Sequence, residues 1–362
     1  MNKIFALSDV YRDEKVKLTA EDDIEKTIGS IIMNRIINIA YKNLDLSEVE
    51  YEADKNLSIL FLENISQANV FKKNLNYLLR ILSEVNCDYA FLKGAYLATK
   101  IYLLGQRTSN DIDILVDSED VDCIQTRLLA CGFVQGKYDR QSKQIIPATR
   151  ERVIRQKMSY GQTVPLVKIY EGYPIEVDLN TSVDFKPEVE KKVVRNLLER
   201  KQLVIFNDYQ MPTLNSVDFL IHLCCHLYKE ATTFDWVKRR KDLCLYKFSD
   251  INLLLNENNQ GDFLIDLGNR ISKLGLEKEC YYSFENSSII YPNLNKLKGF
   301  QELKDKLKPD CLEFMNEVVY PREKKIFRYQ TDDFSERFLL KDRVIDLVDI
   351  TDKVSDWRKN EV

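Results

Sequence analysis

Two aspartates, Asp111 and Asp113, stand two residues apart at the start of an apolar run that ends at Val116. Such a run is typical of a strand, and because side chains alternate along a strand, both carboxylates are expected on one face. Two carboxylates about 5 Å apart repel each other by roughly 3 kcal/mol at an effective dielectric constant near 20. A divalent cation between them removes this cost, and Mg²⁺ in particular combines one or two carboxylates with substrate phosphates. The pair therefore predicts a metal site that handles phosphates.

A lysine and a glycine, Lys93-Gly94, end a short apolar strand upstream of the acid pair. The spacing of apolar residues after them predicts a helix from Ala95 to Leu104, and Gly105 supplies a left-handed cap for its end. A glycine directly before a helix lets backbone N–H groups and the helix dipole approach an anion, and Lys93 adds a point charge. We therefore expect this turn to bind phosphate.

The ordered set of residues resembles the polymerase-beta-type nucleotidyltransferase superfamily, and within it the bacterial branch of uncharacterised nucleotidyltransferases. It consists of Lys93-Gly94, Gly105, Arg107, Ser109 and Asp111-Ile-Asp113-Ile-Leu-Val116. Members of that branch have a Lys-Gly strand end, an arginine shortly before Asp-x-Asp, and a hydrophobic strand after it. The resemblance implies that Asp111 and Asp113 are catalytic metal ligands. It also implies a set of nucleotide-binding residues: Lys93, Gly94, Ala95, Arg107 and Ser109.

The superfamily needs a third acid on a neighbouring strand, where it serves the catalytic metal or acts as a base for the acceptor hydroxyl. Two strand-like runs separated by Glu171-Gly172 predict a hairpin, whose second strand ends at Asn180. In the resembling branch this strand reads acid, Leu, His, aromatic, which is matched here by Asp178-Leu179. We assign Asp178 as the third catalytic and metal-binding carboxylate, with Glu176 as its alternative. A half-exposed strand with polar outward residues is the structural alternative, and Asn180 in place of His leaves a base at that position in doubt.

The expected fold class is α+β, with a small mixed, polymerase-beta-like sheet between helical lobes. Helical patterns run from Ala20 to about Asn43, from near Ser58, and from Phe71 to Val85. We divide the chain into an N-terminal helical lobe (1–86), a nucleotidyltransferase core (87–185) and a mostly helical C-terminal lobe (186–362).

Composition limits the partners. The chain has 362 residues, a formal net charge of −4 and no apolar run long enough to suggest a membrane span, so we expect neither a membrane nor a long nucleic acid as the partner. The eight cysteines lack Cys-x-x-Cys spacing, which argues against a zinc site. Most stand in apolar contexts typical of buried thiols, which favours a reducing cytoplasm.

Three further features have both a structural and a functional interpretation. Residues 137–157 carry seven cationic side chains against two carboxylates, a local net charge of +5, and Lys238–Lys241 are four consecutive cations. Each is either a solvated surface or a contact for phosphate or acceptor. His222 and His226 stand four residues apart, which allows packing, a place beside the nucleotide or acceptor, or a metal site.

The resemblance implies transfer of a nucleoside monophosphate from a triphosphate such as ATP to an acceptor hydroxyl, with release of pyrophosphate. Mg²⁺ is the expected cofactor, with Mn²⁺ as the alternative, and the acceptor is a small molecule or a peptide or protein. One alternative is a toxin-like enzyme that acts on tRNA, which would place residues 137–157 and Lys238–Lys241 on one face. The other is an inactive nucleotide-binding scaffold. It is favoured by Ala95, where many superfamily members have Ser or Gly, and by Asn180, where His is usual.

Overall fold

The computed structural model describes residues 2–19, 22–49, 51–184 and 192–354. Within this part, the chain divides into two compact units, Met1–Phe219 and Leu220–Val362. Helices and a mixed sheet occur together, which confirms the predicted α+β class. The three-lobe division stays a prediction, and its boundary at residues 185 and 186 lies outside the described residues.

The first unit begins with helices. They are α1 (Lys3–Leu7), α2 (Ile24–Met33), α3 (Ile37–Asn43), the 3-10 turn η1 (Leu46–Glu48) and α4 (Tyr51–Leu82). The helical region predicted up to Asn43 is broken between α2 and α3, where Arg35 has a positive φ of 57°. The helices predicted near Ser58 and from Phe71 are parts of the single helix α4.

A mixed sheet forms the rest of the first unit. Its strands are β1 (Tyr89–Phe91), β2 (Ile112–Val116), β3 (Val134–Asp139), β4 (Gln144–Pro147), β5 (Leu166–Tyr170), β6 (Tyr173–Asn180), β7 (Gln202–Phe206) and β8 (Tyr209–Thr213). Their order is β4-β3-β5-β6-β2-β1-β8-β7, with β2 parallel to β6 and β1 parallel to β8. The hairpin predicted at Glu171-Gly172 joins β5 to β6 and is confirmed. Strands β7 and β8 extend the sheet into the region that the sequence analysis assigned to the C-terminal lobe.

Further helices of this unit are α5 (Gly94–Tyr96), the π-helical turn η2 (Leu97–Ile101), α6 (Val121–Ala130), α7 (Arg150–Ser159) and α8 (Val193–Leu198). The helix predicted from Ala95 to Leu104 therefore ends early, at Ile101. The Tyr102 N–H bonds to the Leu97 carbonyl at 2.9 Å, which closes the wider π turn and leaves Tyr102 extended. Gly105 is not the helix cap but lies in the following turn with φ +83°, where a Cβ would come within 2.7 Å of Asn38 Nδ2.

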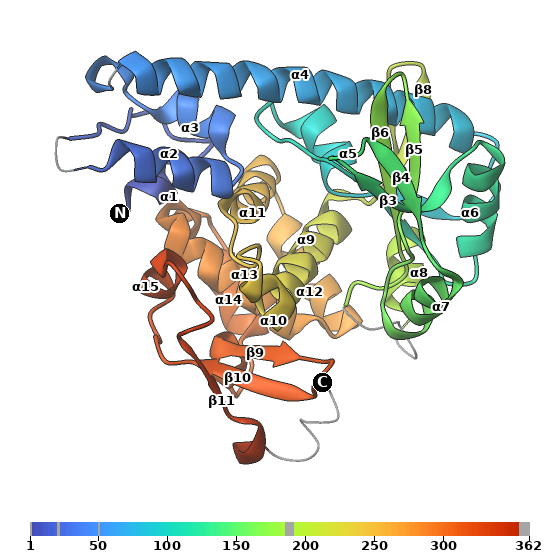
Figure 1. Ribbon diagram of the computed structural model, residues 1–362. Helices are drawn as coiled ribbons and strands as arrows, with labels where there is room; N and C mark the ends of the chain where they lie inside the picture. Colours follow the sequence, from blue (N-terminus) through green and yellow to red (C-terminus); the bar gives the residue numbers. More distant parts are fainter. Residues whose placement is uncertain (1, 20–21, 50, 185–191, 355–362) are drawn as a thin grey trace. The chain divides into compact units, whose positions relative to one another are not determined.

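The core of the first unit lies between α4 and the sheet. Leu75, Leu78 and Leu82 of α4 pack in one cluster with Phe91 of β1 and Ile114 of β2. Each fully buried side chain of this kind stabilises the fold by about 1.5–3 kcal/mol. Figure 1 shows α4 as one long helix, with α2 and α3 beside its first half and the strands beside its second half. The sheet that carries the acids is therefore held in place by packing against α4.

The second unit is mostly helical. Helix α9 (Ser216–Ala231) starts just before it, and α10 (Phe234–Lys238), α11 (Leu245–Glu257), α12 (Phe263–Leu274), α13 (Glu277–Ile290), α14 (Phe300–Leu307) and α15 (Phe334–Leu339) follow. The 3-10 turns are η3 (Pro292–Lys296), η4 (Glu313–Asn316) and η5 (Thr351–Lys353).

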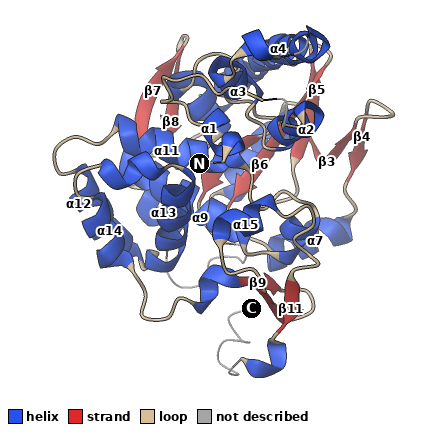
Figure 2. Cartoon of the chain, turned by 90° about the vertical axis from the view of Figure 1, so that its left-hand side faces the viewer, coloured by secondary structure: helices blue, strands red, loops and turns tan. Residues whose placement is uncertain are grey.

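A small antiparallel sheet that the sequence analysis did not predict accompanies these helices. Its strands β9 (Glu317–Tyr320), β10 (Lys325–Tyr329) and β11 (Leu347–Asp349) have the order β11-β10-β9, and β9 and β11 are labelled in Figure 2. None of the described helices has both the length and the apolar composition that crossing a membrane requires.

Candidate functional site

The acidic residues predicted to act together lie on two adjacent strands. Asp113 of β2 is the direct neighbour of Asp178 of β6 in the parallel register. Adjacent strands are about 4.8 Å apart, so the two side chains lie close together. Asp111 directly precedes β2, and Glu176 lies two residues before Asp178 on β6. The sheet therefore brings together the acid pair, the third acid and its alternative.

The local electrostatics show a cluster with excess negative charge. Burial raises the pKa of the Asp178 carboxyl well above its ordinary value, and the Asp113 and Asp111 carboxylates raise it further. Burial and the charge of Asp113 also raise the pKa of Asp111. Asp178 Oδ1 is buried and has no hydrogen-bond partner among the described residues. A buried carboxylate oxygen in this state favours either a proton or a cation beside it.

Lys93 is held against this cluster. Its Nζ donates a hydrogen bond to Asp113 Oδ1 at 2.8 Å, and Asn180 Nδ2 donates to the same oxygen at 3.2 Å. The Lys93 backbone has a positive φ of 42°, an uncommon conformation for a residue other than glycine. The structure thus places Lys93 beside a carboxylate, where its charge opposes the rise in pKa of Asp178.

The glycine at position 94 allows its turn to lie close to Ser109. A Cβ at this position would lie 2.4 Å from both Cβ and Oγ of Ser109, so the turn at Gly94 can meet the loop before Asp111 only without a side chain. Ser109 Oγ in turn donates to the Asp111 carbonyl at 3.1 Å. Gly94 and Ser109 therefore fix the position at which the chain enters the acid pair.

Ala95, which the resemblance places among the nucleotide-binding residues, lies in the short helix α5. It is buried in the core, and its N–H bonds to the Leu92 carbonyl at 3.1 Å. Because α5 passes into a π turn after three residues, the helix behind Gly94 is also shorter than predicted. A helix this short has a correspondingly weaker dipole at its N-terminus.

Two arginines converge on one carbonyl in the loop before the acid pair. Arg107, which is buried, donates from Nη1 to the Thr108 carbonyl at 2.6 Å, and Arg35 donates from Nη2 to the same oxygen at 3.1 Å. Although burial raises the pKa of Asp111, the charges of Lys93 and Arg35 act against that rise. Sequence reasoning missed Arg35, because it stands in the break between two helices and no local motif marks it.

A divalent cation fits the chemistry of this cluster but not its present side-chain arrangement. Among the described residues, no three His, Cys, Asp or Glu side chains are placed to hold a metal ion. The Lys93 ammonium takes one Asp113 oxygen that a cation would use. The donor set of Asp111, Asp113 and Asp178 is nevertheless all carboxylate oxygen, which Mg²⁺ prefers, and no described residue hydrogen-bonds to the buried Asp178 Oδ1.

The basic segment 137–157 forms the hairpin β3–β4 and helix α7. Burial and Asp111 raise the pKa of Glu176, and the charge of Arg140 opposes this rise. One cation of the segment therefore lies within electrostatic reach of the acid cluster.

His226 belongs to a different environment, inside the second unit. Its Nε2 lies 3.4 Å from Glu230 Oε2, and the same carboxylate forms an ion pair with Lys247. His222 lies one turn earlier on α9, with its ring 6.4 Å from that of His226. The metal interpretation of this pair receives no support from the described residues.

A mixed sheet with Asp-x-Asp at the start of one strand and a further aspartate on its parallel neighbour is the arrangement that the resemblance to α+β nucleotidyltransferases implies. Residues 20–292 match the family model described as "Uncharacterised nucleotidyltransferase". The match covers well over half of the chain, and the chain belongs to this nucleotidyltransferase family. It includes the whole acid cluster and extends into the second unit. Comparison with curated proteins finds no match.

Proposed function

We propose that the protein transfers a nucleoside monophosphate from a nucleoside triphosphate such as ATP to an acceptor hydroxyl and releases pyrophosphate. The observation that supports this most is the juxtaposition of Asp113 and Asp178 in parallel register, with Asp111 beside them. A buried oxygen of Asp178 also has no hydrogen-bond partner in the part of the chain that the structure describes. Asp111, Asp113 and Asp178 are the proposed ligands of Mg²⁺, or alternatively of Mn²⁺. Once bound, divalent cations neutralise the triphosphate and stabilise attacking and leaving oxygens.

The remaining residues of the site have positioning roles in this proposal. Asn180 holds the Asp113 carboxylate by donating from Nδ2 to Asp113 Oδ1, and Ser109 holds the Asp111 backbone by donating to its carbonyl. Arg107 and Arg35 fix the Thr108 carbonyl, and their guanidinium groups supply positive charge beside the expected position of the phosphates. Lys93 is the cation that would exchange between Asp113 and a phosphate oxygen.

Asp178 is also the group best suited to take a proton. Its pKa is raised by burial and by the neighbouring carboxylates, and a base is most effective when its pKa lies near the working pH. We propose that the Asp178 carboxylate accepts the proton of the acceptor hydroxyl with the oxygen that does not bind the cation. Glu176, whose pKa burial also raises, is the alternative.

The acceptor proposed is a small molecule or a hydroxyl of a peptide or protein, because the net charge of −4 gives no broad basic surface for a polymer. The local charge of +5 in residues 137–157 keeps tRNA as the enzymatic alternative. An inactive scaffold is the weaker alternative, since a protein without turnover gains nothing from a buried cluster of repelling carboxylates. All eight cysteines are free thiols, which supports a reducing compartment such as the cytoplasm.

The test is a pyrophosphate-release and label-transfer assay on the full chain. Each α-labelled ribonucleoside triphosphate is incubated with Mg²⁺ or Mn²⁺ and with water alone, a protein-free cell extract, a cell protein fraction or total tRNA. We expect metal-dependent pyrophosphate release from one triphosphate, with label passing to the extract or the protein fraction. The variant Asp111→Asn/Asp113→Asn should lose both signals. Release that is absent with every triphosphate, or that persists in this variant, would overturn the proposal.

A further inference from the structure

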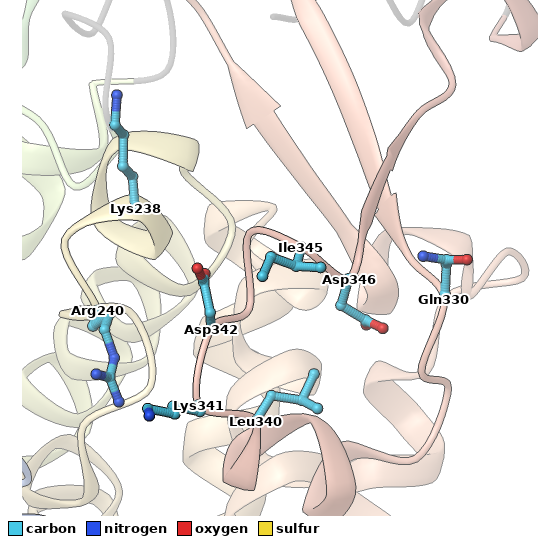
Figure 3. Close-up of a pocket in the computed structure, with 8 residues that line it drawn as sticks. All are labelled: Lys238, Arg240, Gln330, Leu340, Lys341, Asp342, Ile345 and Asp346. Carbon is cyan, nitrogen blue, oxygen red and sulfur yellow. The ribbon is translucent and has the colours of Figure 1, made fainter.

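A pocket in the second unit lies outside the acid cluster and has a volume of about 640 Å³. This is the size of a typical small-molecule site. Lys238 and Arg240 line it from the end of α10 and the turn that follows, and Gln330 lines it from the residue after β10. The segment after α15 supplies the remaining wall with Leu340, Lys341 and Ile345 (Figure 3).

Buried charged groups hold the two segments that form these walls. Arg343 donates to Asp242 through Nε and Nη2, both at 2.7 Å, and both side chains are buried. Arg343 Nη1 also donates to the Phe338 carbonyl at 3.1 Å. Lys247 Nζ donates to the carbonyls of Lys241 and Asp242 at 2.6 and 2.9 Å. The pocket is therefore preformed, which lowers the entropic cost of binding a ligand.

The charges in the pocket are unbalanced. The carboxylates that line it are engaged locally: Asp346 accepts from the Thr331 N–H and hydroxyl at 3.0 and 2.9 Å, and Asp342 accepts from the Val344 N–H at 3.0 Å. Among the described residues, neither these two carboxylates nor Lys238, Arg240 and Lys341 form an ion pair. Three cations against two carboxylates leave the pocket with a net charge of +1.

Two of these cations also face each other. In Figure 3 the Arg240 guanidinium and the Lys341 ammonium point toward one another. Two like charges in one pocket favour an anion between them, because an anion converts their repulsion into attraction. An arginine and a lysine together suit a phosphate group, since the guanidinium binds two oxygens and the ammonium a third.

Apolar side chains share the pocket with these cations. Leu340 and Ile345 line it, and Ile345 is 77% exposed. In Figure 3 the Ile345 side chain lies between Asp342 and Asp346, and it gives a surface that an apolar part of a ligand can cover. The Gln330 amide adds one group that can donate and accept hydrogen bonds.

We propose that this pocket binds a phosphomonoester with an apolar body, at a site separate from the acid cluster. The phosphate lies between Arg240 and Lys341, and the apolar body covers Leu340 and Ile345. This site is independent of the proposed nucleotidyl transfer, since it needs neither the acid cluster nor a metal ion.

The experiment is calorimetric titration of the full chain with phenyl phosphate in EDTA, with inorganic phosphate as the comparison. We expect saturable binding of phenyl phosphate that is at least roughly tenfold tighter than that of inorganic phosphate, because the ring is buried as well. Arg240→Gln/Lys341→Gln should weaken it by at least roughly tenfold, and so should Ile345→Asp, which places a negative charge in the pocket. Both variants alter exposed side chains, and a thermal unfolding scan verifies their folding.

Two controls separate this site from others. Lys273→Gln/Lys296→Gln removes the same number of exposed charges from the second unit outside the pocket, and Asp111→Asn/Asp113→Asn alters the acid cluster. Both should bind phenyl phosphate as the wild type does. Absence of saturable binding, equal affinity for inorganic phosphate, or unchanged binding by the pocket variants would overturn the proposal. Loss of binding in the acid-cluster variant would also overturn it, because the ligand would then occupy the acid cluster.

Discussion

At the residue scale, the site combines groups that are costly to bury with groups that hold them in place. Asp178 has a raised pKa because it is buried beside Asp113 and Asp111. Lys93 and Asn180 offset part of this cost through Asp113 Oδ1, whereas Asp178 Oδ1 has no partner among the described residues. The folded chain therefore keeps an arrangement that lowers its own stability, as functional sites commonly do.

Replacement of Asp178 should reveal this cost. We expect Asp178→Asn to raise the free energy of unfolding by about 1–3 kcal/mol in EDTA at neutral pH, because it removes carboxylate repulsion of that size. The same variant should lose nucleotidyl transfer. Urea unfolding measures the first effect, and the exposed Asp208→Asn serves as a control that should change stability by less than about 0.5 kcal/mol. A less stable Asp178→Asn variant would show that the carboxylate is not repelled in the fold.

Gly94 offers a test of the close approach between its turn and Ser109. We expect Gly94→Ala to destabilise the protein by about 1–3 kcal/mol, because the new Cβ would lie 2.4 Å from Ser109 Cβ and Oγ. Adding Ser109→Gly should restore most of the lost stability in urea unfolding. Gly29→Ala is the matched control, since no heavy atom lies within 4 Å of its new Cβ and alanine in a helix is neutral or slightly stabilising. Failure of Ser109→Gly to rescue would contradict this account.

At the scale of elements, local patterns predicted what depends on local structure. The alternation in residues 174–180 and the turn at Glu171-Gly172 were sufficient to place the β5–β6 hairpin. The spacing of Asp111 and Asp113 predicted a strand start, and β2 begins between them. The resemblance added Asp178, whose place beside Asp113 the sequence alone could not give, because the register of two strands distant in sequence is set by tertiary packing.

The features that the sequence did not predict depend on contacts between distant segments. The apolar spacing after Ala95 continues to Leu104, but the helix ends at a π turn over Leu97–Ile101. The spacing of apolar residues does not predict such a turn. Gly105 instead allows the chain to pass close to the Asn38 side chain. Arg35 reaches Thr108 across 73 residues of sequence, so no local motif could have identified it.

Replacement of Arg35 tests whether the helical region before α4 contributes to the site. We expect Arg35→Ala to weaken triphosphate binding roughly tenfold, since a hydrogen bond from a charged group is worth about 1.5–3 kcal/mol, and Arg35→Lys to recover part of the loss. Calorimetric titration with Mg²⁺ gives both values, and Lys26→Ala on the exposed side of α2 is the control. Equal affinities of wild type and Arg35→Ala would assign Arg35 a purely structural role.

At the scale of the whole molecule, the charge distribution and the family match set the limits of the account. The chain carries a net charge of −4, yet it gathers seven cations in residues 137–157 and four in Lys238–Lys241. Local cationic surfaces of this kind attract anions. The family match spans residues 20–292, so β9, β10 and β11 lie outside it, together with the segment that carries Lys341.

The central claim is that the acid cluster binds a metal–triphosphate complex. Its most direct measurement is calorimetric titration of each ribonucleoside triphosphate, with and without Mg²⁺, into the wild type and into Asp111→Asn/Asp113→Asn. The account predicts that at least one triphosphate binds in a Mg²⁺-dependent manner to the wild type and that the double variant loses this binding while it stays folded. Binding that survives in the double variant, or no binding of any triphosphate to the wild type, would contradict the account.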